Sequence, residues 1–265
     1  MGFDRDSAWF RDYLARAQVG PAMPRGRLLI GSRVCGSVEP RLAQEMVQAG
    51  LPVQASGDGW AVTGAPDESL HAMARWLHAN GHGGKWRHER VAVTDEQGQV
   101  VAAVERAAVR VLGIATQAVH LVGSDADGRV WVQRRALDKA VDPGMLDTLV
   151  GGLAAFGESV ATTLEREAWE EAGLRLADLG EVRDIGRAVV RRPVSDGYMV
   201  EHMAMFSAQV PSHMVPSNQD GEVMGFDCLA VDDLVRRMSA GEFTFEAVLI
   251  HSAWIEAQSS LHLGR

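Results

Sequence analysis

Five glutamates lie within residues 151–174, in a segment whose remaining residues favour a buried helix. Val160 and Leu164 begin an apolar stripe at helical spacing, and the next positions of that stripe are Glu167 and Glu171. Buried carboxylates are costly when they lack a partner, so these two acids need a compensating cation. Carboxylates one helical turn apart can converge on a hard divalent cation such as Mg²⁺, which prefers oxygen ligands. The spacing therefore predicts a metal site on one helix.

Start and stop signals predict that this helix covers residues 159–172. Ser159 is a suitable N-cap, and Gly173 is a suitable C-terminal stop. Glu170 lies beside the stripe, and Arg166 on its flank can neutralise and orient one of the acids. The alternative is a solvated acidic face, which would require the apolar stripe to end before its acidic positions.

A longer pattern surrounds these residues. Gly152 is followed after five residues by Glu158, and after seven more by "REAWEEAGL", which begins at Arg166. This arrangement, G-x5-E-x7-R-E-U-x-E-E-x-G-U with U an apolar residue, resembles the Nudix box of the Nudix hydrolase superfamily. Ala168 stands where a bulkier aliphatic residue is usual.

The resemblance implies a loop–helix–loop that binds Mg²⁺ or Mn²⁺ and hydrolyses a diphosphate linked to another group. Such metal ions neutralise phosphate oxygens and lower the pKa of a bound water. Gly151 and Gly152 would let the backbone approach the metal or the phosphates. The implied metal ligands are Glu167 and Glu171, assisted by Glu158, Glu170 and the carbonyl of Gly152, with Arg166 orienting the acids.

Flanking residues bear on the substrate. The stretch "QRRALDKAVDPGMLDTLVGG" resembles that of isopentenyl diphosphate isomerases, which belong to the same superfamily and use basic residues here to meet a diphosphate. Arg135 and Lys139 occupy those positions and are candidate diphosphate ligands. Gly151 and Leu153 stand where that isomerase needs its cysteine and its histidine metal site, which argues against isomerase activity.

Three other stretches, "GKWRHERVAV", "DPGMLDTLVGGL" and "VPSNQDGEVMGF", resemble a Nudix branch that includes part of fungal thiamine diphosphokinase fusions and plant plastid relatives. This resemblance implies a cleanup enzyme that hydrolyses thiamine diphosphate and its oxidised analogues to monophosphates. Two alternatives remain: hydrolysis of another nucleoside diphosphate derivative such as ADP-ribose or NADH, and a non-catalytic diphosphate-binding sensor.

Two acids outside the box are further candidates. Glu222 follows the turn Asp220–Gly221, and an acid near this point in related enzymes often supplies a metal ligand or the general base. A solvated turn is an equal alternative for Glu222. Asp147 either contacts the substrate or stabilises a turn.

Other reactive side chains favour structural roles. His78 and His82 are one helical turn apart, but Gly81 interrupts the helix between them, so a zinc site is the weaker interpretation. Cys228 lies in an apolar run without an activating base. Trp169 points away from the inward acids, which predicts a contact with the first half of the chain or with another subunit and leaves a homodimer open.

The elements that must position these residues divide the chain into two parts. Residues 1–107 alternate short strands and helices and are expected to form a small α+β domain. Residues 108–265 contain hairpins at 124–128 and 195–197 around the acidic helix, which predicts an α/β/α sandwich with a mixed sheet. The predicted fold class is therefore α+β, with the Nudix domain following the smaller unit.

The composition bears on the partners of the protein and on its compartment. The net charge of −9 argues against binding to nucleic acid, and no apolar run reaches the roughly 20 residues of a membrane span. The first residues lack the basic-then-apolar pattern of a signal peptide. Two distant cysteines, Cys35 and Cys228, predict a reducing compartment, so we expect a cytoplasmic protein with a small-molecule diphosphate as its partner.

Overall fold

The computed structural model describes residues 3–263, and the side chains of residues 3–258. The first half comprises α1 (Ala8–Arg16), β1 (Gly26–Ile30), β2 (Arg33–Val38), α2 (Pro40–Gln48), β3 (Val53–Ser56), β4 (Gly59–Val62), α3 (Pro66–Ala79), β5 (Arg90–Thr94), β6 (Val100–Glu105) and the 3₁₀ turn η1 (Arg106–Ala108). The second half comprises β7 (Thr116–Ser124), β8 (Val130–Arg135), β9 (Leu146–Asp147), β10 (Val150–Leu153), α4 (Val160–Ala172), η2 (Leu176–Asp178), β11 (Arg183–Val194), β12 (Gly197–Gln209), β13 (Val223–Leu229), α5 (Val231–Ser239) and α6 (Phe245–Leu263).

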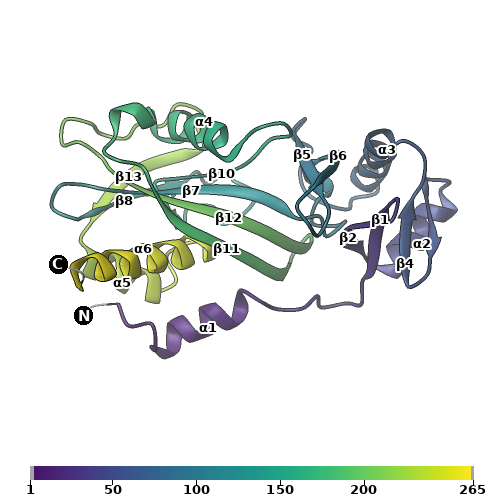
Figure 1. Ribbon diagram of the computed structural model, residues 1–265, viewed down its shortest axis with the longest axis horizontal. Helices are drawn as coiled ribbons and strands as arrows, with labels where there is room; N and C mark the ends of the chain where they lie inside the picture. The colour runs from purple at the N-terminus through teal and green to yellow at the C-terminus, as the bar shows by residue number, and fades with distance from the viewer. Residues whose placement is uncertain (1–2, 264–265) are drawn as a thin grey trace.

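A large mixed sheet organises the second half. Its strand order is β11-β12-β7-β8-β13, with β10 added to β7 and β9 added to β8. β12 and β7 run parallel, whereas β11 with β12 and β13 with β8 run antiparallel. Helix α4 covers one face of this sheet, and α5 and α6 cover the other (Figure 1). The predicted α+β class, with a mixed sheet between helices, is confirmed.

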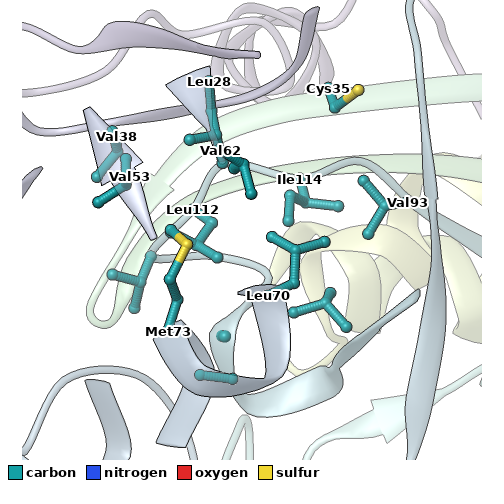
Figure 2. Close-up of a cluster of buried hydrophobic side chains, with 14 of the residues drawn as sticks. Leu28, Cys35, Val38, Val53, Val62, Leu70, Met73, Val93, Leu112 and Ile114 are labelled. Carbon is teal, nitrogen blue, oxygen red and sulfur yellow. The ribbon is translucent and has the colours of Figure 1, made fainter. Parts of the chain in front are cut away.

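The first half has a core of its own. A four-stranded sheet with the order β2-β1-β4-β3 and the hairpin β5-β6 pack with α2 and α3. Leu28, Leu70 and Met73 lie in this core with no exposed surface. Figure 2 shows Leu112 and Ile114 among the same side chains. These two residues follow the predicted boundary at residue 107, yet they pack with the unit that precedes it.

The N-terminal helix packs with the second half of the chain, although it precedes the first core in sequence. Phe10 on α1 is 3% exposed and belongs to the core beneath the large sheet, and Tyr13 stacks on Phe245 of α6 with ring centroids 5.4 Å apart. The backbone then joins β11, since Val19 N donates to Arg191 O at 2.8 Å. α1 is amphipathic and buries its aromatic face against α6, so residues 3–19 pack with the second half. The division at 107 stays a prediction, and the two cores divide the chain differently from it.

Within residues 3–263, no helix combines the length and the apolar character that a membrane crossing requires. The longest helix, α6, has its N-terminal end in the wall of the cleft described below and packs along the large sheet (Figure 1).

Replacing Phe10 by alanine tests whether α1 belongs to the second core. We expect Phe10→Ala to lower the free energy of unfolding by about 3–5 kcal/mol, because it empties a buried aromatic site. Leu14→Ala on the same helix is the control, since Leu14 is 38% exposed and is expected to change stability by less than about 1 kcal/mol. Urea unfolding measures both. Equal effects of the two substitutions would contradict the assignment of α1 to the core.

Candidate functional site

Helix α4 has the limits that its sequence predicts. Ser159 is the N-cap, with its hydroxyl accepting from Thr162 N at 3.1 Å. Gly173 ends the helix in the left-handed conformation with φ 64°. A side chain there would also approach Ser217 O within 2.8 Å, so both the backbone and the space require glycine. These two ends fix which face of α4 meets the sheet.

The inward face of α4 carries Glu171. Leu164 and Ala168 on that face are buried against the sheet, and Glu171 is only 2% exposed. The Glu171 carboxylate accepts hydrogen bonds from Gly151 N at 2.8 Å and from Gln133 Nε2 at 3.0 Å. Burial, and secondarily the charge of Glu167, raises the pKa of Glu171 to about 8. The carboxylate is thus hydrogen-bonded by neutral donors, and the positive charge of Lys139 only partly offsets the effect of burial.

Glu167 lies against the backbone of Gly152. A Cβ added to Gly152 would stand 2.0 Å from Glu167 Oε1, so only glycine leaves room for this carboxylate. Burial raises the pKa of Glu167 to about 7, although Arg166 at 2.9 Å opposes that rise. Glu171 thus lies beside Gly151 and Glu167 beside Gly152, and the role of the two acids as metal ligands stays a prediction.

Arg166 holds the remaining acids of the box. Its guanidinium donates to both carboxylate oxygens of Glu158, at 2.8 and 2.9 Å, and to Glu170 at 2.9 Å. The hydrogen bonds from Arg166 lower the pKa of Glu158 to about 2, against the effect of burial. Leu153 O accepts a further bond from the same guanidinium at 3.2 Å. Glu158 and Glu170 are thus ion-pair partners of Arg166 here, and their predicted metal contacts stay a prediction.

The donor set at Glu167 and Glu171 fits a divalent cation. Across the described side chains, no group of three or more His, Cys, Asp or Glu residues is arranged to hold a metal ion. Mg²⁺, however, commonly takes one or two protein carboxylates and fills its other positions with water and substrate phosphates. Two adjacent buried carboxylates with raised pKa values, beside a backbone that a Cβ would block, match that mode.

A cleft of about 460 Å³ opens beside Gly151 and Gly152. Both predicted diphosphate ligands lie in its wall, and each is already paired. Arg135 contacts Asp147 at 3.0 Å, and Lys139 donates to Glu222. Burial alone would raise the pKa of Glu222, but Lys139 outweighs it and holds that pKa below its ordinary value. Glu222 is therefore ionised near the box, as a base or metal ligand must be, and Asp147 serves as an ion-pair partner.

Several residues of this cleft escaped the sequence analysis because they come from distant segments. A second cavity of about 280 Å³ adjoins the first, and some residues from both halves of the chain line both cavities. The sequence could have indicated Glu201, because this acid lies between Met199 and Met203 at alternate positions of β12 and interrupts an inward apolar pattern. The residues not anticipated are Arg87, Arg106, Arg110, His120, Arg192, Glu201 and Glu246.

The weaker candidates have structural surroundings. His82 stacks on Trp76 with centroids 6.2 Å apart, and His78 lies against Trp86. Burial raises the pKa of the Cys228 thiol to about 11, which disfavours a nucleophile. Trp169 is 47% exposed, with the guanidinium of Arg175 over its ring. A contact between Trp169 and another subunit stays a prediction.

Comparisons with known proteins point to one family. The family model described as NUDIX domain matches residues 115–248, which is half of the chain. Nudix hydrolase 24, chloroplastic, of Arabidopsis thaliana is 36% identical over 157 residues, covering 56% of this chain and 42% of that protein. Nudix hydrolase 20, chloroplastic, of the same plant is 36% identical over 137 residues, covering 50% of this chain and 36% of that protein. The chain thus spans less than half the length of these two relatives.

Structural comparison agrees on the fold. The crystal structure of DR0079 from Deinococcus radiodurans superposes with a TM-score of 0.52 at 24% sequence identity. The superposition covers 63% of this chain and 99% of that one. At this identity the likeness concerns the fold alone.

Glu201 gives the cleft a pH-dependent stability. Burial, and then the nearby Glu246, raises its pKa to about 7, whereas Arg110, Arg106 and Arg192 oppose the rise. The folded pKa exceeds the ordinary value of 4.5, so the folded state binds the extra proton and loses stability as pH rises from 4.5 to about 7. We expect Glu201→Gln to remove this loss and to be more stable than the unaltered protein by about 3 kcal/mol at pH 8, with little difference near pH 4.5.

Thermal unfolding across this pH range measures that difference. Glu165→Gln is the matched control, because Glu165 is exposed on α4 and should leave the pH profile unchanged. A Glu201→Gln protein that is no more stable than the unaltered one at pH 8 would contradict the destabilising effect of an ionised, buried Glu201.

Proposed function

The chain belongs to the NUDIX domain family, and from that membership we propose that it is a metal-dependent hydrolase of a small-molecule diphosphate. Nudix hydrolases generally use divalent metal ions. The observation that carries the proposal is the pair Glu167 and Glu171, the first largely buried and the second fully buried, beside Gly152 and Gly151 at the edge of a cleft lined by cations.

Each residue of the site has a distinct part in this chemistry. Glu167 and Glu171 would hold a Mg²⁺ or Mn²⁺ ion, which when bound polarises phosphorus and lowers the pKa of an attacking water. Arg166 fixes the geometry of Glu158, Glu167 and Glu170 through its hydrogen bonds. This arrangement keeps the acids of the box oriented before the substrate arrives.

The cleft supplies the diphosphate contacts and a proton acceptor. Arg135 and Lys139 line it and would bind the phosphate oxygens, while Glu222 is ionised and able to accept a proton from water. Gly151 and Gly152 leave the backbone accessible beside the acids. Water attack at phosphorus would then break the anhydride bond and give a monophosphate and, from a terminal diphosphate, inorganic phosphate.

Thiamine diphosphate and its oxidised analogues are the best candidates for the substrate. The sequence resemblance to the branch with plant plastid members supports them, and the similarity to two chloroplastic Nudix hydrolases of Arabidopsis is in keeping with that branch. A cleft of about 460 Å³ has the size of small-molecule sites. Another nucleoside diphosphate derivative such as ADP-ribose or NADH is the alternative, and a non-catalytic sensor is the second. Cytoplasmic location and a homodimer remain proposals.

Glu171→Gln tests the mechanism. Amide replacement keeps the size of the side chain but removes the metal ligand, so we expect kcat to fall at least about 100-fold with the fold unchanged. Glu165→Gln, on the exposed face of the same helix, is expected to keep kcat within about twofold. Monophosphate formation with Mg²⁺ measures both, and circular dichroism checks the fold. Full activity of the Glu171→Gln protein would rule out the proposed metal site.

A substrate panel separates the alternatives. We expect monophosphate formation from thiamine diphosphate and oxythiamine diphosphate, with higher kcat/KM than for ADP-ribose and NADH. Chelation of divalent ions should stop turnover, because the carboxylate pair alone cannot activate water. Tight binding of one compound without turnover of any would favour the sensor, whereas preference for ADP-ribose or NADH would favour the other hydrolase.

A further inference from the structure

One cation of the cleft is unlike the others. Arg106, Arg110, Arg135, Lys139 and Arg192 all line the cleft, and each has a carboxylate within ion-pair distance. Their partners are Glu89, Asp196, Asp147, Glu222 and Glu246 respectively. Arg87 lines the same cleft and, among the described residues, its guanidinium has no hydrogen-bonding or ion-pair partner. Its charge is therefore available to an anion that enters.

The backbone of Arg87 is nevertheless held in place. Arg87 N donates to Glu105 Oε1 at 2.8 Å, and Glu105 is only 3% exposed. Just ahead of it, Gly84 N donates to Ala107 O at 3.0 Å. Gly83 has φ 84°, and a Cβ on it would approach the same carbonyl within 2.4 Å, so the loop passes directly over η1. A loop held this closely presents its arginine from a fixed position.

Arg106 brings a second positive charge from the first half of the chain to the same cleft. Arg106 lies on η1, the turn over which the Gly83–Gly84 loop passes, and its backbone N donates to Glu89 O at 2.9 Å. Burial raises the pKa of Glu222 and Lys139 lowers it most, and the charges of Arg87 and Arg106 lower it further, so both arginines act on the acid paired with Lys139. Arg106 also reaches Glu167 electrostatically. The first half of the chain thus brings positive charge to the acids of the box.

The extra charge of Arg87 matches a particular kind of diphosphate. A terminal phosphate loses a second proton near about pH 6, and a phosphate bridged between two organic groups has no such proton. A substrate ending in a diphosphate therefore brings one more negative charge into the cleft. The paired cations already have carboxylate partners, and Arg87 is the cation that can meet this additional charge.

We propose that Arg87 binds the terminal phosphate of the substrate and that this contact makes the protein selective for terminal diphosphates over bridging ones. The inference rests on the proposed hydrolysis of a diphosphate and assigns the first half of the chain a direct part in substrate binding. A charge-assisted contact of this kind changes affinity by about 10- to 100-fold.

Arg87→Ala is the central variant, with Arg75→Ala as its control. Arg75 is exposed on α3 of the same unit and lies outside the cleft. We expect Arg87→Ala to raise KM for thiamine diphosphate about 10- to 100-fold and to change KM for ADP-ribose by less than about threefold. Arg87→Lys should recover part of the loss, because it keeps the charge but not the forked donor geometry. Equal changes for both compounds would overturn the selectivity.

Binding of inorganic pyrophosphate separates this inference from the proposed function. Calorimetric titration with Mg²⁺, in the unaltered and Glu171→Gln proteins, does not depend on turnover. In both backgrounds Arg87→Ala should weaken the Kd for pyrophosphate about 10-fold or more, and Arg75→Ala should leave it within twofold. An unchanged Kd in the Arg87→Ala protein, or no pyrophosphate binding to the unaltered protein, would overturn the role of Arg87. Failure of the metal site would instead show as full activity of Glu171→Gln.

Discussion

The contacts of Arg166 determine how the acids of this site share their charge. One guanidinium satisfies both oxygens of Glu158 and also contacts Glu167 and Glu170. Glu171, one turn farther along α4, is held by neutral donors alone. The acids therefore divide into Glu158 and Glu170, which Arg166 compensates, and Glu167 and Glu171, whose ionisation is opposed by burial although Arg166 also contacts Glu167. Only the second group has an electrostatic need for a further cation, which is why the composition of the box alone does not locate the metal.

The cleft beside these acids is a product of both halves of the chain. The large sheet supplies Glu201, and the start of α6 supplies Glu246. The smaller unit supplies Arg106 from η1 and Arg87 from the loop before β5. The hairpin between β11 and β12 is fastened to the smaller unit, since Tyr198 N donates to Arg110 O at 2.9 Å. A Nudix core without the smaller unit would keep the acidic helix but lose Arg87 and Arg106 from the cleft.

Local patterns predicted much of this site because the relevant residues are close in sequence. Helical spacing predicted that Glu167 and Glu171 point inward, and Ser159 and Gly173 predicted the two ends of the helix. The fold class followed from alternating strands and a single inserted helix. A helical wheel gives the direction of a side chain but not its partner, so the sequence predicted that Arg166 orients acids of the box but not that it pairs with both Glu158 and Glu170. Arg87 and Glu246 line the same cleft only through the tertiary fold, and no local pattern could predict that.

The path of the chain gives the smaller unit two attachments to the large sheet. Residues 17–19 run beside β11 before the unit begins, and residues 115–116 enter β7 after it ends. A unit joined by one linker can rotate about it, whereas two fixed crossings permit only a narrow hinge movement. Arg87 is therefore carried on a part whose position relative to the large sheet is held at both of its ends. The distance between Arg87 and the carboxylate pair therefore limits the length of the group that fits between them.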